Sequence, residues 1–298
     1  MTKKELEESR KKHDELFRSL LNNKEEFISF IKYFVNPETN LTKNNLEKYN
    51  RSFITTRFES RNSDIVYKEK NRETYYLIEH QSSIDYDMPY RMLEYSYEII
   101  RDTIDKEKLK SKNYELPKVI PIVLYTGNQK WKIPNVIGLI SDGKYEDVGL
   151  RLKYILVDTN KYSKKELLSS NSMVGYAMQA DRSSTSEEVT NAIERMLKSK
   201  PKMHKEIYKM ILYVFKERLE KTEQESLKQQ IKEGKVEEVM ITVRERLEQN
   251  NERILKKGIA QAILQRNRSI AKNLLNIGMN KKDIQKVTGL SIKEIEKL

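Results

Sequence analysis

The spacing of hydrophobic and polar residues in the first 200 positions changes from helical to strand-like and back. Apolar residues recur at helical spacing over residues 13–35, which predicts a helix that ends before Pro37. Residues 52–58 are polar and β-branched, whereas residues 63–68 and 75–81 alternate between two faces. We expect a strand in each of these three segments.

The next segments complete a mixed α/β pattern. Asn71 and Arg72 lie between two alternating runs and predict the tip of a hairpin. An apolar stripe over residues 87–104 predicts a long helix, and a continuous apolar run over residues 118–125 predicts a strand that is buried on both faces. Residues 151–157 predict another strand. The order of these elements indicates an α/β fold with a central mixed β-sheet flanked by helices.

The last hundred residues have a purely helical pattern. Gly278 and Gly289 separate short segments near the end, as in a small helix-turn-helix, although a cap or an oligomerisation element fits equally well. The predicted helices span residues 203–219, 222–249, 254–277, 281–288 and 291–298. We therefore expect two regions, an α/β domain over residues 1–200 and a basic, all-α region with a charged arm over residues 201–298.

Composition excludes several classes of protein. The chain has 298 residues and no cysteine, so thiolate metal sites, disulfides and cysteine nucleophiles are excluded. Its longest apolar runs are too short to cross a bilayer, and residues 1–12 are charged throughout, unlike the start of a signal peptide. We expect a cytoplasmic protein with no membrane partner.

The basic residues are concentrated towards the end of the chain. The net charge is +12, and residues 200–298 contribute +9 of it, from 23 Lys and Arg against 14 Asp and Glu. Such an excess is typical of proteins that bind a polyanion such as DNA, because neutralised phosphates release counterions. A solvated helical surface that happens to be rich in lysine is an equally good interpretation.

One group of residues suggests chemistry. Asp64 lies in one predicted strand, and Glu79, His80 and Gln81 end the next. On neighbouring strands, the two carboxylates could share a face, with the backbone carbonyl of His80 close by. These hard oxygen ligands suit Mg²⁺ or Mn²⁺, which could activate water against a phosphate. Taken alone, the short pattern is more often made of ordinary solvent-facing residues.

The order of several motifs resembles one family. The chain is similar to the recombination-promoting nuclease and putative transposase family, a branch of the PD-(D/E)XK nuclease superfamily. The similarity covers most of the chain, and its most specific motifs are E-H-Q-S-S and V-L-Y-T-G. The matching segments are His13-Asp14 with Leu16-Phe17, Asp64–Tyr67, Ile78–Ser83, Pro89–Met92 with Tyr95, Ile120–Gly127 with Trp131, Leu274–Met279 and Thr288–Leu290.

The resemblance implies a restriction-endonuclease-like core that cleaves DNA phosphodiesters with a metal ion. By position, Asp64 and Glu79 would hold Mg²⁺ (or Mn²⁺) together with the backbone carbonyl of His80. The third position is usually lysine in the wider superfamily and is Gln81 here. Glutamine can position water but cannot take up a proton or supply a charge. Lys68 alternates onto the face of Asp64, and we hypothesise that it lends the missing charge.

Other residues have two interpretations each. Asp14 matches an acidic residue of the first helix that assists the metal in this superfamily, or it serves only as first-turn charge. Arg91 and Tyr95 share a helix face and could contact phosphate and sugar. Alternatively, Arg91 forms a surface pair with Asp87 while Tyr95 packs in the core. For His13 and Trp131 we expect packing or capping, although Trp131 could stack on a base.

Three functions fit these patterns. The first, which we favour, is a Mg²⁺-dependent DNA endonuclease that promotes recombination and works on the nucleoid. A homodimer would suit double-strand cleavage, because one site cuts one strand. The second is a catalytically inactive DNA-binding protein on the same fold, with Gln81 as the sign of lost catalysis. The third is a structural or oligomeric protein in which the acidic residues are incidental.

Overall fold

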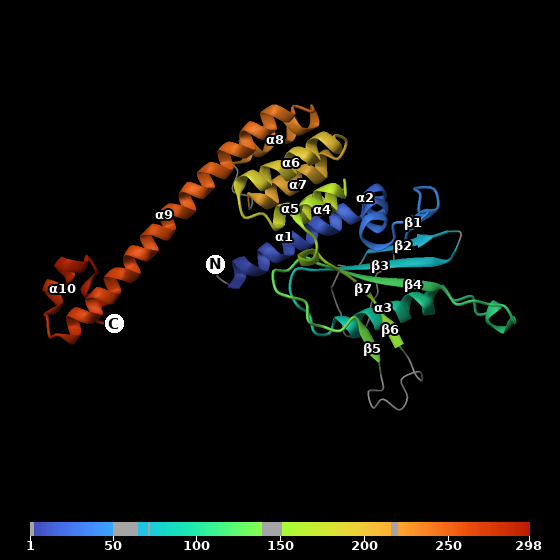
Figure 1. Cartoon of the computed structure of the whole chain (residues 1–298), viewed down its shortest axis with the longest axis horizontal. Helices are drawn as coiled ribbons and strands as arrows, with labels where there is room; N and C mark the ends of the chain where they lie inside the picture. The colour runs from blue at the N-terminus through green and yellow to red at the C-terminus, as the bar shows by residue number, and fades with distance from the viewer. Residues whose placement is uncertain (1–2, 50–64, 71, 139–150, 216–219) are drawn as a thin grey trace. The chain divides into compact units, whose positions relative to one another are not determined.

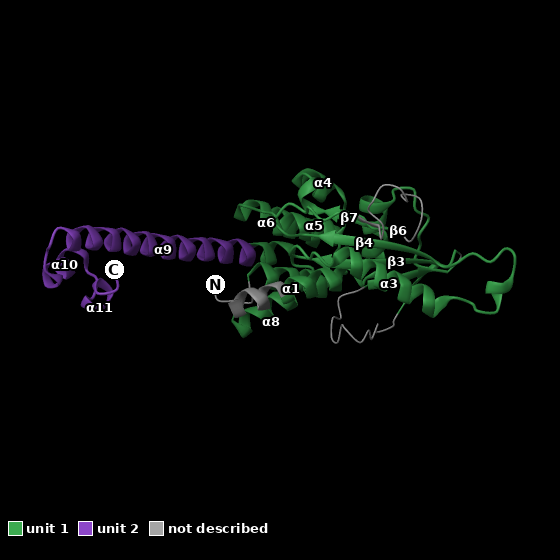
Figure 2. Ribbon diagram, turned by 90° about the horizontal axis from the view of Figure 1, so that it is seen from below, with its two compact units in different colours: residues 1–240 green, residues 241–298 purple. Residues whose placement is uncertain are grey.

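The computed structural model describes residues 3–49, 65–70, 72–138, 151–215 and 220–298. It divides into two compact units, residues 1–240 and residues 241–298, shown in green and purple in Figure 2. Each unit is described below by itself. The domain boundary that the sequence places near residue 200 stays a prediction. None of the helices within the described ranges combines the length and the apolar character that a membrane crossing requires.

A five-stranded mixed sheet is the centre of the first unit (Figure 1). Strands β1, β2 and β3 pair antiparallel, whereas β3, β4 and β7 pair parallel. The strands lie in the order β1 (Leu46–Lys48), β2 (Ile65–Glu69), β3 (Thr74–Gln81), β4 (Lys118–Tyr125) and β7 (Ile155–Asp158). This architecture confirms the predicted mixed sheet flanked by helices, and β3 lies in its middle.

The predicted hairpin is present, since Glu69 of β2 pairs with Thr74 of β3. The strand predicted over residues 151–157 is wrong as a single element. Residues Arg151–Lys153 (β6) pair with Val136–Gly138 (β5) in a separate two-stranded sheet, and only β7 joins the main sheet. Tyr154 lies at the change of sheet. It is fully buried, and its hydroxyl donates to the carbonyl of Pro134 (3.1 Å). The strand predicted over residues 52–58 lies outside the described residues.

Helix α3 (Met88–Thr103) covers one face of the sheet and matches the predicted helix, with Asp87 and Ile104 as its flanking residues. Its apolar side chains form a core with those of the strands. Trp131 is part of this core, 4.8 Å from the Tyr125 ring between centroids, which agrees with packing. The core consists of Val66, Tyr75, Leu77, Met88, Met92, Tyr95, Ile99, Val123, Tyr125, Trp131, Ile133 and Tyr154. A short 3₁₀ turn, Lys108–Lys110 (η2), follows α3.

Helix α1 (Lys3–Leu21) contacts β3 from the other face of the sheet, and α2 (Lys24–Phe30) follows it. The single helix predicted over residues 13–35 is therefore two helices. The side chain of Asn23 accepts hydrogen bonds from the backbone of the first turn of α2, which begins a new helix there. A π-helical turn, Ile31–Val35 (η1), then ends before Pro37 as predicted.

Five further helices lie beside α1 and α2 in Figure 1. The sequence analysis makes no prediction for the first three, although Ser163, Ser172 and Thr185 each cap one with a side-chain oxygen. A 3₁₀ turn, Thr159–Lys161 (η3), leads into them. The helices are α4 (Lys164–Ser169), α5 (Met173–Asp181), α6 (Ser186–Ser199), α7 (His204–Val214) and α8 (Lys221–Lys232).

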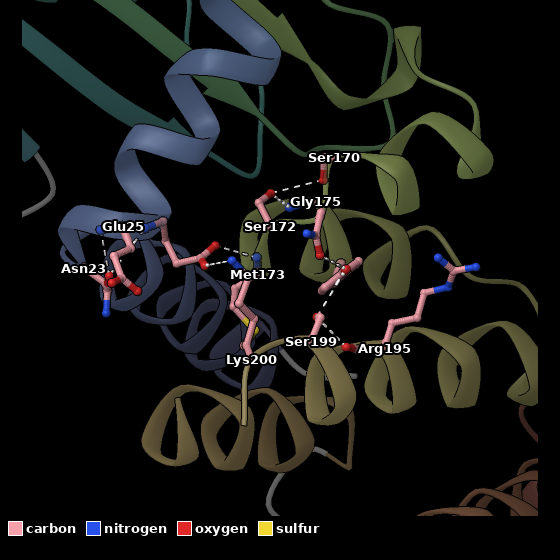
Figure 3. A network of polar contacts seen from close by, with 12 residues as sticks. Asn23, Glu25, Ser170, Ser172, Met173, Gly175, Arg195, Ser199 and Lys200 are labelled. Atoms are coloured by element: carbon pink, nitrogen blue, oxygen red, sulfur yellow. Dashed lines mark hydrogen bonds and ion pairs between the residues drawn. The ribbon is translucent and has the colours of Figure 1, made fainter. Parts of the chain in front are cut away.

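A buried acid connects three of these helices. Glu26 of α2 is fully buried, and one of its carboxylate oxygens accepts from the backbone N–H of Met173 at the start of α5 (2.5 Å). The other lies 3.0 Å from the ammonium of Lys200, which ends α6. Figure 3 shows Met173 and Lys200 at this junction, where the side-chain oxygen of Ser172 accepts from the backbone N–H of Gly175 and caps α5. The positive end of α5 and one lysine thus share a single carboxylate.

The chain after residue 220 is helical, as predicted, but its helices have different bounds. Gly234, with φ +72°, divides the helix predicted over residues 222–249 into α8 and the start of α9 (Val236–Asn276), which continues through the helix predicted over residues 254–277. Gly278 (φ +84°) and Gly289 (φ +68°) turn the chain into α10 (Lys281–Thr288) and α11 (Ile292–Ile295). A small core holds these turns together, formed by Ala271, Ile284, Leu290 and Ile295.

We predict that Glu26→Ala lowers the free energy of unfolding by about 3 kcal/mol, because it leaves the ammonium of Lys200 and the N–H of Met173 without their acceptor. The exposed neighbour Glu25 is the matched control, and Glu25→Ala should cost less than about 1 kcal/mol. Urea denaturation followed by circular dichroism measures both. Equal losses in the two variants would contradict the role assigned to Glu26.

Candidate functional site

The end of strand β3 places polar side chains on both faces of the sheet. Successive residues of a strand point to opposite faces, so Glu79 and Gln81 share the α3 face with Leu77, while His80 points towards α1. Glu79 is fully buried and His80 is nearly so. The sequence analysis predicts these faces correctly. Asp64, the other predicted metal ligand, lies outside the described residues.

Arg91 of α3 joins two carboxylates on the first face. Its guanidinium donates to Oε1 of Glu79 and to Oδ2 of Asp85, the latter at 2.6 Å. The amide of Gln81 also donates to Oε1 of Glu79 (2.8 Å). Arg91 is only 2% exposed, and its charge lies 5.7 Å from the centre of the Tyr95 ring. Burial acts to lower the pKa of Arg91, but the charge of Glu79 outweighs it and keeps the guanidinium fully charged.

Arg91 and Tyr95, which the sequence suggests as contacts to DNA, come together with Glu79, whereas Lys68, suggested as the source of the missing charge, does not. Lys68 pairs with Tyr75 across β2 and β3, four residues from Glu79 along the strand, which is about 13 Å. Its ammonium lies 5.5 Å from the centre of the Tyr75 ring and 4.0 Å from the carboxylate of Glu73. The structure thus places Lys68 at the hairpin end of the sheet.

On the opposite face, His80 meets the first helix. Nδ1 of His80 lies 3.1 Å from Oδ1 of Asp14, and its Nε2 lies 2.9 Å from the hydroxyl of Thr126. The His80 ring stacks on Phe17 with a centroid separation of 4.6 Å. Burial lowers the pKa of His80, although the contact with Asp14 acts in the opposite direction. The predicted helix acid Asp14 therefore contacts the histidine side of β3.

His13 extends this cluster towards the helical layer. Its Nδ1 lies 3.9 Å from Oδ1 of Asp14, and its Nε2 lies 3.2 Å from Oδ2 of Asp181 at the end of α5. The hydroxyl of Tyr213, in α7, donates to the other oxygen of Asp181 (2.7 Å). His13 is buried as expected, but among charged groups and not only among apolar ones.

The charges of this cluster shift one another's pKa values. Burial acts to lower the pKa of His13, but the contacts with Asp14 and Asp181 outweigh it and raise the pKa to about 9. Burial acts to raise the pKa of Asp14, but the two histidines hold it well below its usual range. His13 in the same way keeps the pKa of Asp181 low. Burial and the charge of Asp181 raise the pKa of Tyr213, which stays a neutral donor.

Sequence reasoning missed Asp85, Thr126, Asp181 and Tyr213 as members of these two clusters. Asp181 had a usable signal, because it ends the apolar stretch over residues 173–180 and so belongs to a buried helix. Asp85 closely follows the E-H-Q-S-S motif, and Thr126 is itself the threonine of the V-L-Y-T-G motif. Tyr213 reaches the cluster only through tertiary packing.

The donor chemistry of the Glu79 side suits a divalent ion. Glu79 and Asp85 both offer carboxylate oxygens, the ligands that Mg²⁺ prefers, and the charge of Arg91 now lies between them. The residues therefore fit Mg²⁺ in kind, with Asp64 as the further carboxylate that the sequence assigns to this site.

A mixed sheet with helices on both faces and a buried acid at the end of its central strand defines an α/β protein with a nuclease-like fold. The chain belongs to the family described as "Putative transposase, YhgA-like", whose model matches residues 11–208. It is also 29% identical over 123 residues to the recombination-promoting nuclease RpnD of Escherichia coli O157:H7. That match covers 39% of this chain and 46% of the relative. No solved structure matches the chain significantly.

We predict that Arg91→Met lowers the free energy of unfolding by about 3–5 kcal/mol, because it leaves the carboxylate of Glu79 buried without its cation. Arg101→Met, on an exposed arginine of the same helix, is the control and should cost less than about 1 kcal/mol. Guanidinium denaturation of both variants provides the comparison. A similar small loss at both positions would mean that the Glu79–Arg91 pair contributes little to stability.

Proposed function

We propose that the protein is a metal-dependent DNA endonuclease that hydrolyses phosphodiester bonds and so promotes recombination. The observation that carries the proposal is the buried carboxylate of Glu79, with Gln81 beside it on the same face at the end of the central strand. A carboxylate in such a place is costly to bury without a partner cation, and Arg91 supplies one from α3 in this structure. Membership of the transposase family and the similarity to a recombination-promoting nuclease support the same activity.

In this proposal, Asp64, Glu79 and the backbone carbonyl of His80 hold Mg²⁺ (or Mn²⁺). The bound ion would polarise the phosphate and lower the pKa of the attacking water. Gln81 orients that water by hydrogen bonding, since its amide cannot take up a proton. Arg91 is a positioning residue, because it holds the carboxylate of Glu79 from α3.

The proposed substrate is DNA, which the basic excess of residues 200–298 would attract. Of Lys68, Arg91 and Tyr95, we assign Lys68 to the phosphate of the bound strand, because Arg91 and Tyr95 are each only 2% exposed. A catalytically inactive DNA-binding protein is the second candidate. It is favoured by one observation, that Glu79 already accepts from both Arg91 and Gln81.

Asp64→Ala and Glu79→Gln should each slow the relaxation of supercoiled plasmid in Mg²⁺ at least about 100-fold, the loss typical of removing a group that stabilises charge in the transition state. EDTA should abolish cleavage by the unchanged protein. Glu73→Gln is the matched control, because Glu73 is an exposed acid of the same hairpin, and its rate should not change. Full activity of Asp64→Ala would overturn the proposal. If neither the unchanged protein nor any variant cleaves the plasmid, the inactive DNA-binding candidate would be favoured.

Binding of DNA is tested separately from cleavage. The affinity of the unchanged protein and of Asp64→Ala for duplex DNA should fall in parallel as salt rises, because counterions are released when basic side chains neutralise phosphates. Fluorescence anisotropy in EDTA, which prevents cleavage, measures both. The absence of any binding at low salt would point instead to the structural or oligomeric alternative.

A further inference from the structure

The cluster on the α1 face of β3 contains three polar atoms that have no good partner. Nδ1 of His13, Oδ1 of Asp14 and Nδ1 of His80 are buried, and none makes a hydrogen bond of acceptable geometry within the described part of the chain. Nδ1 of His80 lies 3.1 Å from Oδ1 of Asp14 but is not aligned with it as a donor. All three atoms lie within 4.8 Å of one another. Three unsatisfied polar atoms that converge in a buried place need a common partner.

The outer nitrogen of each histidine is already engaged. Nε2 of His80 lies 2.9 Å from the hydroxyl of Thr126, which in turn is 3.5 Å from the backbone carbonyl of Gln81. With the hydroxyl oriented towards that carbonyl, Thr126 would accept the proton of Nε2. Nδ1 of His80 then presents a lone pair to the carboxylate of Asp14. Two acceptors this close are stable only with a cation between them.

His13 has the same arrangement. Its Nε2 faces the carboxylate of Asp181, which Tyr213 holds in place through its hydroxyl, and its Nδ1 faces Asp14. Histidines that bind metals almost always donate their other ring N–H to a carboxylate, a hydroxyl or a carbonyl, which sets the tautomer and aims the free nitrogen at the ion. Both histidines of this cluster have that outer partner.

We propose that His13, Asp14 and His80 bind a divalent transition metal of the zinc class, through Nδ1 of each histidine and Oδ1 of Asp14. Two imidazoles and one carboxylate suit Zn²⁺ and similar ions and not Mg²⁺. Ligand atoms about 2.0–2.1 Å from a tetrahedral ion lie about 3.3 Å apart. The separations of Asp14 from His80 (3.1 Å) and from His13 (3.9 Å) bracket that value. A water molecule takes the remaining position, on the half-exposed side of Asp14.

This site is separate from the Mg²⁺ site proposed at Glu79. Glu79 and His80 are consecutive residues of β3, so their side chains lie on opposite faces of the sheet. The ligands of the second site come from α1 and β3, and its outer partners come from α5, α7 and the end of β4. A bound ion would join the first helix to the central strand, whether or not the protein cleaves DNA.

The test is a titration of the full-length, metal-stripped protein with Co²⁺, a probe for zinc sites that absorbs visible light when nitrogen ligands bind it. Excess Mg²⁺ is present throughout to occupy sites made only of oxygen ligands. We expect one Co²⁺ per chain, displaced by Zn²⁺. Asp14→Asn should weaken binding at least 100-fold, and Asp181→Asn, which removes an outer partner, about 10–100-fold. Glu15→Gln, on the exposed neighbour of Asp14, should bind as the unchanged protein does.

Circular dichroism of each variant establishes that it is folded, and Asp181→Asn keeps the test usable if Asp14→Asn is not. Failure of the unchanged protein to bind one Co²⁺ or Zn²⁺ per chain would overturn the proposal and leave the cluster as a proton-bridged charge network. Binding that is equal in Asp14→Asn, Asp181→Asn and Glu15→Gln would also overturn it. Because the readout is metal binding, neither result depends on nuclease activity.

Discussion

The alternation of β3 at its polar end is the constraint on which both clusters depend. This strand is central in the sheet and covered on both faces, so no side chain between Thr74 and His80 can avoid burial. Two consecutive ionisable residues, Glu79 and His80, must therefore be satisfied on opposite faces. On each face, a helix provides the partner: Arg91 of α3 pairs with Glu79, and Asp14 of α1 lies beside His80. Both polar clusters are thus centred on two consecutive residues of one strand.

The buried side chains of Glu79 and His80 have different kinds of partner on the two faces of the sheet. On the α3 face, the guanidinium of Arg91 is shared between Glu79 and Asp85, and the planar fork of arginine allows it to serve both carboxylates. On the α1 face, the described residues of the cluster include no lysine or arginine, and its only basic groups are the imidazoles of His13 and His80. Two carboxylates and two imidazoles lie together there, and only their outer atoms are held, by Thr126 at one end and by Tyr213 at the other. The permanent charge of Arg91 suits a rigid support for Glu79. Imidazoles, which can lose a proton, suit a site that can bind a metal ion.

Much of the fold could be predicted from local patterns, because those patterns reflect local physics. The bounds of α3 follow from its apolar stripe and its flanking residues. Strand β4 follows from a continuous apolar run, which is typical of a strand that is buried on both faces. The break at Asn23 was missed because a side-chain cap competes with helical periodicity that continues on both sides of it. The change of sheet at Tyr154 was missed because it depends on a burial site formed by distant residues.

The candidate site also has a part that local patterns predict and a part that they do not. Alternation alone assigns Glu79 and Gln81 to one face and His80 to the other, and the structure agrees. The partners of these side chains are 12, 46 or even more than 60 residues away, at Arg91, Thr126 and Asp14, and no local pattern encodes such distances.

The position of His80 also changes how the E-H-Q motif is interpreted. When only the first and third residues are considered, the middle one contributes a backbone carbonyl and nothing more. In the folded chain, its imidazole is buried, stacked on Phe17 and directed at the carboxylate of Asp14. A residue with only a packing role would need no hydroxyl partner at Nε2 and no acid at Nδ1. The histidine therefore links the first helix to the strand that carries Glu79.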